Sequence, residues 1–264
     1  MATAVLKSEL FLFFEQLARA RERALLLDYD GTIAPFRANR NQAFPYAEVP
    51  ELLDSIMSTC GTRVVVISGR PAVEIRPLLG SIPQPEIWGA HGVERLLPDG
   101  SYEVLPLPEA AISALTEAAV RLRNEGLGHL CESKAGALAI HWRGLKRTQV
   151  EQVRETAYRS LVSLACQADL RIVEFDGGVE LRVRGGNKAH AVRTVLSEVA
   201  EDVPIAYMGD DVTDEDAFQE VNARGLTVLV RPTLRASKAQ MWLRPPEELI
   251  QFLLDWIRAC GGDV

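Results

Sequence analysis

The sequence predicts an α/β protein whose core is a doubly wound parallel sheet, with a smaller α/β module of αββαββ order inserted into it. Short continuous apolar runs alternate with longer helical patterns in both halves of the chain. Such runs are typical of strands covered on both faces, as in a parallel sheet between helices. Between residues 107 and 185 the pattern changes, and helices alternate with pairs of strands. With 264 residues, 47% hydrophobic and 25% charged, the chain is long enough to build this core.

The first part of the core starts with a buried strand, because the apolar residues 24–27 run directly into Asp28. A similar run at residues 63–67 predicts a second buried strand, and Pro50 marks the start of the helix between the two. The turn Pro98-Asp99-Gly100 predicts a hairpin. The elements predicted here are a strand at 24–28, a helix at 49–60, a strand at 63–67, a helix at 72–79, a strand at 86–90 and hairpin strands at 93–97 and 102–105.

The inserted module is predicted to span residues 107–185, which leaves 1–106 and 186–264 for the core. Asp176-Gly177-Gly178 supplies the turn of its last hairpin. Its elements are a helix at 108–125, strands at 129–133 and 137–142, a helix at 148–167, and strands at 170–175 and 179–183. The core then resumes with a helix at 188–199, a strand at 205–209, a helix from Asp214 with Thr213 as N-cap, a strand at 226–230 and a helix at 246–260.

Composition narrows the choice of partners. The net charge of -7 gives no global field that would attract nucleic acid or an anionic membrane, so an anionic ligand must be held by local groups. Four well-separated cysteines without a C-x-x-C pair favour a reducing cytoplasm over a disulfide framework or a zinc site. Charged Lys7, Glu9 and Glu15 interrupt the apolar residues 11–14, so we expect an amphipathic helix there and no signal peptide. No obligatory protein partner is evident.

Carboxylates follow two of the predicted core strands. Asp28 and Asp30 lie where the first strand ends, which is the edge at which ligands of open parallel sheets bind. A plain turn at Asp30-Gly31 is the alternative. After the strand at 205–209, five carboxylates fall within residues 210–216. Helix capping accounts for those at 214–216 but leaves Asp210 and Asp211 unexplained, and oxygen ligands without His or Cys indicate magnesium.

Polar and basic residues occupy two further positions at this edge. Ser68-Gly69-Arg70 follows the second strand and precedes a helix, where phosphate is commonly bound, although an ordinary serine N-cap explains the segment equally well. Lys188 begins the helix that re-enters the core. Because a cation in the first turn opposes the helix dipole, its placement indicates a nearby anion, unless it is simply a solvated surface lysine.

Together these segments resemble the four motifs of the haloacid dehalogenase superfamily of phosphotransferases. The stretch Gly209 to Phe218, GDDVTDEDAF, is similar to the trehalose-6-phosphate phosphatase family in particular. The resemblance extends to residues 132–134, 141–143 and 180–182 of the inserted module, which are similar to that family's cap-domain substrate motifs. The chain departs from the family at Trp142, Val183 and Ala189, and none of these changes removes a polar catalytic group.

The resemblance implies a magnesium-dependent phosphatase of trehalose biosynthesis, with the inserted module as a substrate-specificity cap. Asp28 would be the nucleophile that forms an aspartyl phosphate, and Asp30 the general acid and base. The metal residues would be Asp28, the main-chain carbonyl of Asp30 and Asp210 as ligands of magnesium, and Asp214 orienting the metal or its waters, with Asp211 as a weaker candidate for the same duty. The remaining expected contacts are Ser68, Gly69 and Lys188 to phosphate, and Arg70, His91, Glu132, Lys134, Arg143 and Glu180 to the sugar phosphate.

Other functions stay open at this point. Another capped sugar-phosphate phosphatase, acting on sucrose phosphate or a glycosyl-3-phosphoglycerate, is the nearest alternative. A phosphoglycerate substrate carries an extra carboxylate and needs more cap cations than Lys134, Arg143 and Arg182 supply. A non-catalytic sugar-phosphate-binding module on the same fold is the third reading. The nucleophile and second acid at Asp28 and Asp30 argue against it, since a binding module needs neither.

Overall fold

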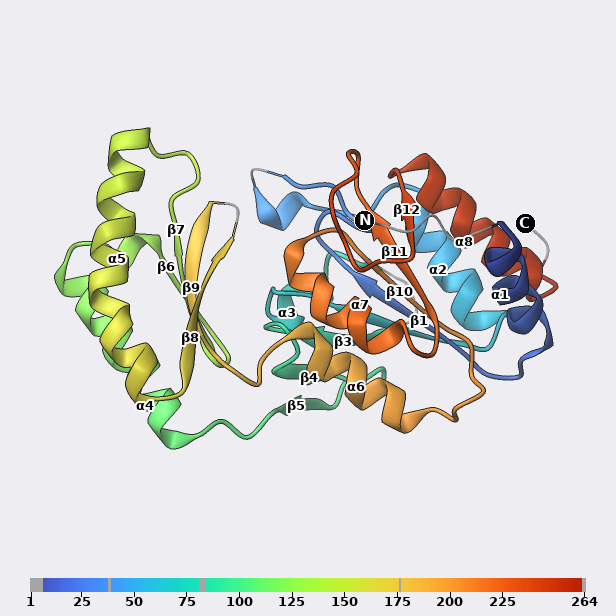
Figure 1. Cartoon of the computed structure of the whole chain (residues 1–264), viewed down its shortest axis with the longest axis horizontal. Coiled ribbons are helices and arrows are strands. Elements are labelled where there is room, and N and C mark those ends of the chain that lie inside the picture. Colours follow the sequence, from blue (N-terminus) through green and yellow to red (C-terminus); the bar gives the residue numbers. More distant parts are fainter. Residues whose placement is uncertain (1–6, 38, 81–83, 176, 263–264) are drawn as a thin grey trace. The chain divides into compact units, whose positions relative to one another are not determined.

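A computed structural model describes residues 7–37, 39–80, 84–175 and 177–262. It divides into two compact units (Figure 1). Unit 1 comprises residues 1–103 and 187–264, and unit 2 comprises residues 104–186. Within the described ranges, no helix is both long and apolar enough to cross a membrane.

Unit 1 is built on an eight-stranded sheet of order β12-β11-β10-β1-β2-β3-β4-β5. The pairings from β12 to β3 are parallel, and β4 runs antiparallel to β3. The strands are β1 (Arg23–Asp28), β2 (Thr62–Ile67), β3 (Glu86–Gly89), β4 (Glu94–Leu96), β5 (Tyr102–Val104), β10 (Ile205–Gly209), β11 (Leu226–Val230) and β12 (Met241–Leu243).

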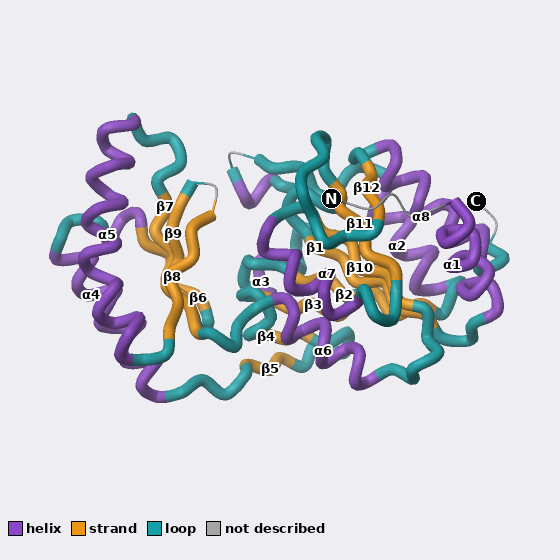
Figure 2. Tube along the Cα trace, viewed as in Figure 1, coloured by secondary structure: helices purple, strands orange, loops and turns teal. Residues whose placement is uncertain are grey.

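Apolar side chains fill both faces of this sheet, as the continuous apolar runs predicted. Figure 2 shows the helices of unit 1 beside its strands. Alternate residues of β1 divide between the two layers, with Leu25 and Leu27 in one and Ala24 and Leu26 in the other. The first layer packs against α1 (Lys7–Arg19), α2 (Val49–Ser58), α3 (Ala72–Ile75) and α8 (Glu247–Ala259), and the second against α6 (Lys188–Glu198) and α7 (Glu215–Val221). The predicted doubly wound α/β fold class is confirmed.

The predicted amphipathic character of the first helix is also confirmed. Phe13 and Leu17 of α1 are buried in the core, whereas the polar residues Glu9, Gln16 and Arg19 of the same helix are exposed.

Unit 2 is a four-stranded antiparallel sheet of order β6-β7-β9-β8 with two helices. Its element order is αββαββ, as predicted: α4 (Glu109–Asn124), β6 (Cys131–Lys134), β7 (Ala137–His141), α5 (Arg147–Gln167), β8 (Leu170–Phe175) and β9 (Gly178–Val183). The predicted turn at Asp176-Gly177-Gly178 lies partly outside the described residues, because Asp176 is not described. Gly177 has φ +86°, and Gly178 begins β9.

Three elements differ from the sequence predictions. The helix predicted at 72–79 ends at Ile75, because Pro77 has no N–H to continue it, and turns lead to Gly80 at φ +74°. The strand predicted at 129–133 starts only at Cys131, after a 3-10 turn at Gly128–Leu130. The short edge strand β12 had no sequence signal, since three residues are too few to establish a period.

The N-cap predicted at Thr213 is wrong. Thr213 lies inside a 3-10 turn, η3 (Val212–Asp214), which is capped by Asp211, and α7 then begins at Glu215 with Asp214 as its N-cap residue. The side chain of Asp214 is not used to cap α7 and is instead directed to the partners described below.

Candidate active site

Three of the predicted segments meet at the carboxyl ends of adjacent parallel strands. β1 lies between β10 and β2 in the sheet. Asp28 is the last residue of β1, while Asp210 and Ser68 directly follow β10 and β2. Carboxylate oxygens of Asp28, Asp210 and Asp214 all lie within 4.8 Å of one another. The structure therefore contains a buried cluster of three acids, called the acidic cluster below, at the edge where ligands of such sheets bind.

Lys188 connects two members of the acidic cluster. Its Nζ donates to Oδ1 of Asp28 at 2.5 Å and to Oδ1 of Asp214 at 2.7 Å, and the lysine is 3% exposed. The hydroxyl of Thr32 donates to the other oxygen of Asp28 at 2.9 Å. The anion expected beside this first-turn lysine is therefore a pair of carboxylates. An ammonium has three N–H groups, and the described residues accept two of them.

Asp214 is fully buried and accepts four hydrogen bonds. Oδ1 accepts from Lys188 and, at 2.5 Å, from the hydroxyl of Tyr207. Oδ2 accepts from the main-chain N–H groups of Asp210 and Asp211 at 3.1 and 3.0 Å. These bonds engage both oxygens of Asp214, so this side chain acts as a brace between the lysine and the loop after β10. Tyr207 was not predicted, because it lies within an apolar run that carries no polar signal.

Asp210 has the opposite environment. Its side chain is nearly buried, yet among the described residues no donor forms a hydrogen bond to its carboxylate. Gly31, with φ +90°, leaves room for it, since a Cβ at Gly31 would lie 2.2 Å from Oδ2 of Asp210. A buried carboxylate without donors is costly unless a cation compensates it. Asp211, the weaker metal candidate, is the N-cap residue of η3, and its main-chain carbonyl accepts from the N–H of Asp214 at 3.0 Å.

Burial and neighbouring charges change the pKa values of Asp28, Asp210 and Lys188. Burial raises the pKa of Asp28 to about 7 even though Lys188 lowers it. Burial, followed by the charges of Asp28 and Asp214, raises the pKa of Asp210 to about 9. Burial alone would lower the pKa of Lys188, but Asp214 and Asp28 outweigh it and hold the pKa well above its ordinary value. The acidic cluster is thus electrostatically suited to a divalent cation, which would stabilise the ionised forms of Asp28 and Asp210.

Asp30 is paired with an arginine. Nε and Nη2 of Arg70 donate to the two carboxylate oxygens of Asp30 at 2.7 and 2.6 Å. The main-chain N–H of Arg70 also donates to Oγ of Ser68 at 3.1 Å. The pair of Arg70 with Asp30 links the loop after β1 to the loop after β2.

The loop after β3 supports the loop after β2. Ala90 and His91 have φ +47° and +57°, a left-handed conformation that non-glycine residues rarely adopt. Their N–H groups donate to the carbonyls of Arg70 and Ser68 at 2.8 and 2.9 Å. A Cβ at Gly69 would lie 2.6 Å from Cε1 of His91, so the imidazole packs directly on this glycine. Predicted residues Ser68, Gly69, Arg70 and His91 therefore form one connected group.

The other predicted substrate residues lie in unit 2. Glu132 and Lys134 on β6 lie on the same face of the sheet as Glu180 on β9. On β7, Ala139 is paired with both Glu132 and Glu180, and Ala137 is paired with Lys134. Nζ of Lys134 is 3.3 Å from Glu180 and 3.9 Å from Glu132. Nε2 of His141 lies 2.7 Å from Glu132. Arg143 is exposed in the turn after β7. The shared face of Glu132, Lys134 and Glu180 thus combines acceptors with a cation.

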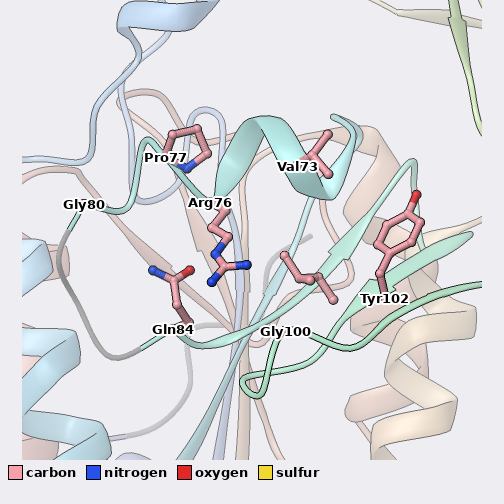
Figure 3. Close-up of a pocket in the computed structure, with 8 residues that line it drawn as sticks. Val73, Arg76, Pro77, Gly80, Gln84, Gly100 and Tyr102 are labelled. Carbon is pink, nitrogen blue, oxygen red and sulfur yellow. The ribbon is translucent and has the colours of Figure 1, made fainter.

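A cavity of about 580 Å³ lies elsewhere in unit 1 (Figure 3). It is lined by Val73, Arg76, Pro77, Gly80, Gln84, Leu96, Gly100 and Tyr102. None of these residues belongs to the acidic cluster or to the loops around it. The candidate active site is therefore the acidic cluster and its surroundings.

Comparison with known proteins identifies a family whose sequence pattern this chain matches. The family model described as trehalose-phosphatase matches residues 26–244. A trehalose-phosphate phosphatase of Mycobacterium marinum is 31% identical over 245 residues, covering 87% of this chain and 60% of the relative. The chain therefore spans about three fifths of that relative's length.

Solved structures match the fold at lower identity. The C-terminal domain of a Candida albicans trehalose-6-phosphate phosphatase superposes with a TM-score of 0.78 at 20% identity, covering 99% of both chains. A haloacid dehalogenase-like hydrolase from Bacteroides thetaiotaomicron superposes with a TM-score of 0.64 at 15% identity, covering 89% of this chain and 99% of the other. The fold is thus that of the haloacid dehalogenase-like hydrolases. On the extent of the family match, the chain belongs to the trehalose-phosphatase family.

Proposed function

We propose that the chain is a magnesium-dependent phosphatase that hydrolyses trehalose 6-phosphate to trehalose and phosphate. The observation that carries this proposal is the buried Lys188 bridging Asp28 and Asp214 beside Asp210, to whose carboxylate no described residue donates. A module that only binds sugar phosphate has no need of several carboxylates crowded around a buried lysine. Transfer of a phosphoryl group to a carboxylate does require such a group of charges. Membership of the trehalose-phosphatase family supports the same conclusion.

The donor set fits a hard divalent cation. Mg²⁺ would be held by the carboxylates of Asp28 and Asp210 and by the main-chain carbonyl of Asp30. When bound, it offsets the repulsion between the Asp28 carboxylate and an anionic phosphate. Asp214 has both oxygens engaged by hydrogen bonds, so we assign it a positioning role in place of direct ligation.

The chemistry then proceeds in two displacements. A carboxylate oxygen of Asp28 bonds to phosphorus while the bond between phosphorus and the sugar oxygen breaks, and Asp30 donates a proton to that oxygen. Water then attacks phosphorus, Asp30 accepts its proton, and inorganic phosphate leaves as the Asp28 carboxylate is restored. The third N–H of Lys188, the hydroxyl of Ser68 and the main-chain N–H of Gly69 would hold phosphate oxygens.

Unit 2 is proposed as the substrate-specificity cap. Its shared face of Glu132, Lys134 and Glu180 offers acceptors and donors that suit a ligand rich in hydroxyl groups. Arg143 and, from unit 1, His91 stay candidate substrate contacts. The free cysteines, which are Cys60, Cys131, Cys166 and Cys260, fit a protein that works in the reducing cytoplasm. We propose the sugar phosphate as its partner, without nucleic acid, membrane or another protein.

The proposal is tested by phosphate release from a panel of sugar phosphates, with and without chelator. The panel contains trehalose 6-phosphate, sucrose 6-phosphate and a glycosyl-3-phosphoglycerate. We expect trehalose 6-phosphate to have the highest kcat/KM, chelator to abolish turnover and Mg²⁺ to restore it. Asp28→Asn, as the control, should bind substrate but turn over at background. Higher kcat/KM for another substrate would reassign the specificity, and no turnover of any substrate would favour a binding module.

A further inference from the structure

Arg70 uses its entire guanidinium inside unit 1. Nε and Nη2 donate to the two oxygens of Asp30, and Nη1 donates to the carbonyl of Arg40 at 2.7 Å. The guanidinium carbon lies 5.7 Å from the centre of the Tyr29 ring. The side chain is 8% exposed. All three guanidinium nitrogens therefore have partners within the protein.

The main chain of Arg70 is fixed as firmly as its side chain. Its N–H donates to Oγ of Ser68, and its carbonyl accepts from the N–H of Ala90. Tyr29, below the guanidinium, is fully buried and donates from its hydroxyl to the carbonyl of Ala43 at 2.8 Å. Arg70 is thus a rigid support that presents two parallel N–H groups to Asp30.

A two-pronged contact of this kind fixes the plane as well as the position of a carboxylate. Each oxygen of Asp30 accepts from a different nitrogen of one planar group, which limits rotation about the side-chain torsions of the aspartate. Lysine offers a single point charge and cannot reproduce this constraint. The orientation of Asp30 therefore depends on the arginine.

We infer that Arg70 is a positioning residue that acts through Asp30, in place of the sugar contact expected from the sequence. This inference rests on the proposed phosphatase function, in which Asp30 gives a proton to the leaving sugar oxygen and later takes one from water. Arg70 exchanges no proton and forms no covalent bond in either step. Its contribution is to hold the carboxylate at the angle that proton transfer requires, where a misplacement of about 1 Å costs on the order of 100-fold in rate.

The test compares steady-state kinetics of Arg70→Gln and Arg70→Lys with the wild type on trehalose 6-phosphate. Both variants should lower kcat by about 10- to 100-fold while KM changes by less than about threefold, since only an interaction specific to the transition state is lost. Lysine should rescue little of the loss. A sugar contact would instead raise KM with kcat retained, and that result would overturn the inference.

A double-mutant cycle with Asp30→Asn asks whether Arg70 acts through Asp30. Once Asp30 is replaced, adding Arg70→Gln should lower kcat by less than about twofold, because residues that act as a unit are not additive. Full additivity of the two losses would overturn the inference. Thermal unfolding of each variant separates loss of fold from loss of orientation.

The leaving group provides a second readout that a purely structural role would not change. p-Nitrophenolate leaves without needing a proton, so its first release from p-nitrophenyl phosphate should be slowed much less by Arg70→Gln than release of trehalose. Equal slowing of both releases would contradict a role through Asp30.

Arg95→Gln is the matched control. Arg95 is 15% exposed and donates from two nitrogens to the two oxygens of Glu198, outside the candidate site. Its loss should lower stability and leave kcat and KM unchanged. If the wild type hydrolyses no sugar phosphate, the proposed function is refuted. If the wild type is active but the Arg70 variants change only KM, or their losses add fully to that of Asp30→Asn, the inference about Arg70 alone is refuted.

Discussion

Replacing Asp210 with asparagine should stabilise the metal-free protein while abolishing the proposed phosphatase activity. Asp210 is nearly buried, and its carboxylate has no hydrogen-bond donor among the described residues and stands within 4.8 Å of two other carboxylates. Asparagine has nearly the same shape and no charge. The variant therefore removes repulsion that the wild type relieves only by binding a cation or by taking up a proton.

The size of the effect follows from proton linkage. Burial and the neighbouring acids raise the pKa of Asp210 from 3.8 to about 9. Between these values the folded protein holds a proton that the unfolded chain has released, so stability falls by about 1.4 kcal/mol per pH unit as pH rises. Roughly three pH units separate the unfolded pKa from pH 7, which sets a ceiling of about 4 kcal/mol.

Local rearrangement and water entry make the change in stability smaller than this upper limit, but half of the limit is still a measurable change. At about 2–4 °C per kcal/mol for a chain of this size, the melting temperature of chelated Asp210→Asn should rise by at least about 4 °C at pH 7. The difference from the wild type should grow from pH 6 to pH 9. Mg²⁺ should raise the melting temperature of the wild type and not that of the variant.

The same chemical change four residues later should have the opposite sign. Asp214 accepts four hydrogen bonds, and an asparagine amide would turn its NH₂ group toward donors on one side. Asp214→Asn should therefore destabilise the chelated protein by about 3–5 kcal/mol. Asp216→Asn is an exposed control that should change stability by less than about 1 kcal/mol. A lower melting temperature for chelated Asp210→Asn than for the wild type would refute the reasoning.

Two further predictions concern unit 1. Gly31→Ala places a Cβ 2.2 Å from Oδ2 of Asp210, at a residue with φ +90°, so this variant should weaken the Mg²⁺-induced rise in melting temperature. Gly80→Ala is the control, because Gly80 has φ +74° and open space around it. This control should cost only about 1 kcal/mol of backbone strain and leave the Mg²⁺-induced rise unchanged. An equal Mg²⁺ response in both variants would contradict the steric argument. Burial alone would raise the pKa of Glu198, but hydrogen bonds from Arg95 and Arg63 outweigh burial and lower the pKa below 4.5. The ion pairs of Glu198 therefore contribute their full stability above pH 4.5, and this contribution is lost as the pH falls below that value. Melting curves of Glu198→Gln should therefore lie below the wild type at pH 7 and converge with it in acid, and a constant gap would argue against the ion pairs.

Much of the fold was predictable because the signals are local. Strand β1 is an apolar run that ends abruptly at Asp28, and the run before Asp210 has the same form. Adjacent parallel strands bring such ends together without any further information. Lys188 was predicted to face an anion because its place in a first helical turn is unfavourable by itself, and two carboxylates lie within hydrogen-bond distance.

The remaining features depend on contacts between distant segments. Asp30 and Arg70 are separated by 40 residues, and nothing in either segment indicates a two-pronged pair. Tyr207 lies in an apolar strand, where its bond to Asp214 leaves no trace in the periodicity. Thr213 was predicted as a cap from composition, but a 3-10 turn shifted the start of α7 by one residue. Tertiary packing decided each of these outcomes.

The junction between the two units has a consequence for how this architecture diversifies. Unit 2 ends at Gly186, Asn187 caps α6 with its side chain, and Lys188 is the next residue. The lysine that binds two carboxylates of the acidic cluster is thus only two residues beyond the end of unit 2. If unit 2 were exchanged for another insertion, the proposed phosphatase activity should be retained only where residues 187 and 188 keep their distance along the chain from the point of joining. The position of this junction is therefore fixed to within one residue, while the inserted sequence is free to vary.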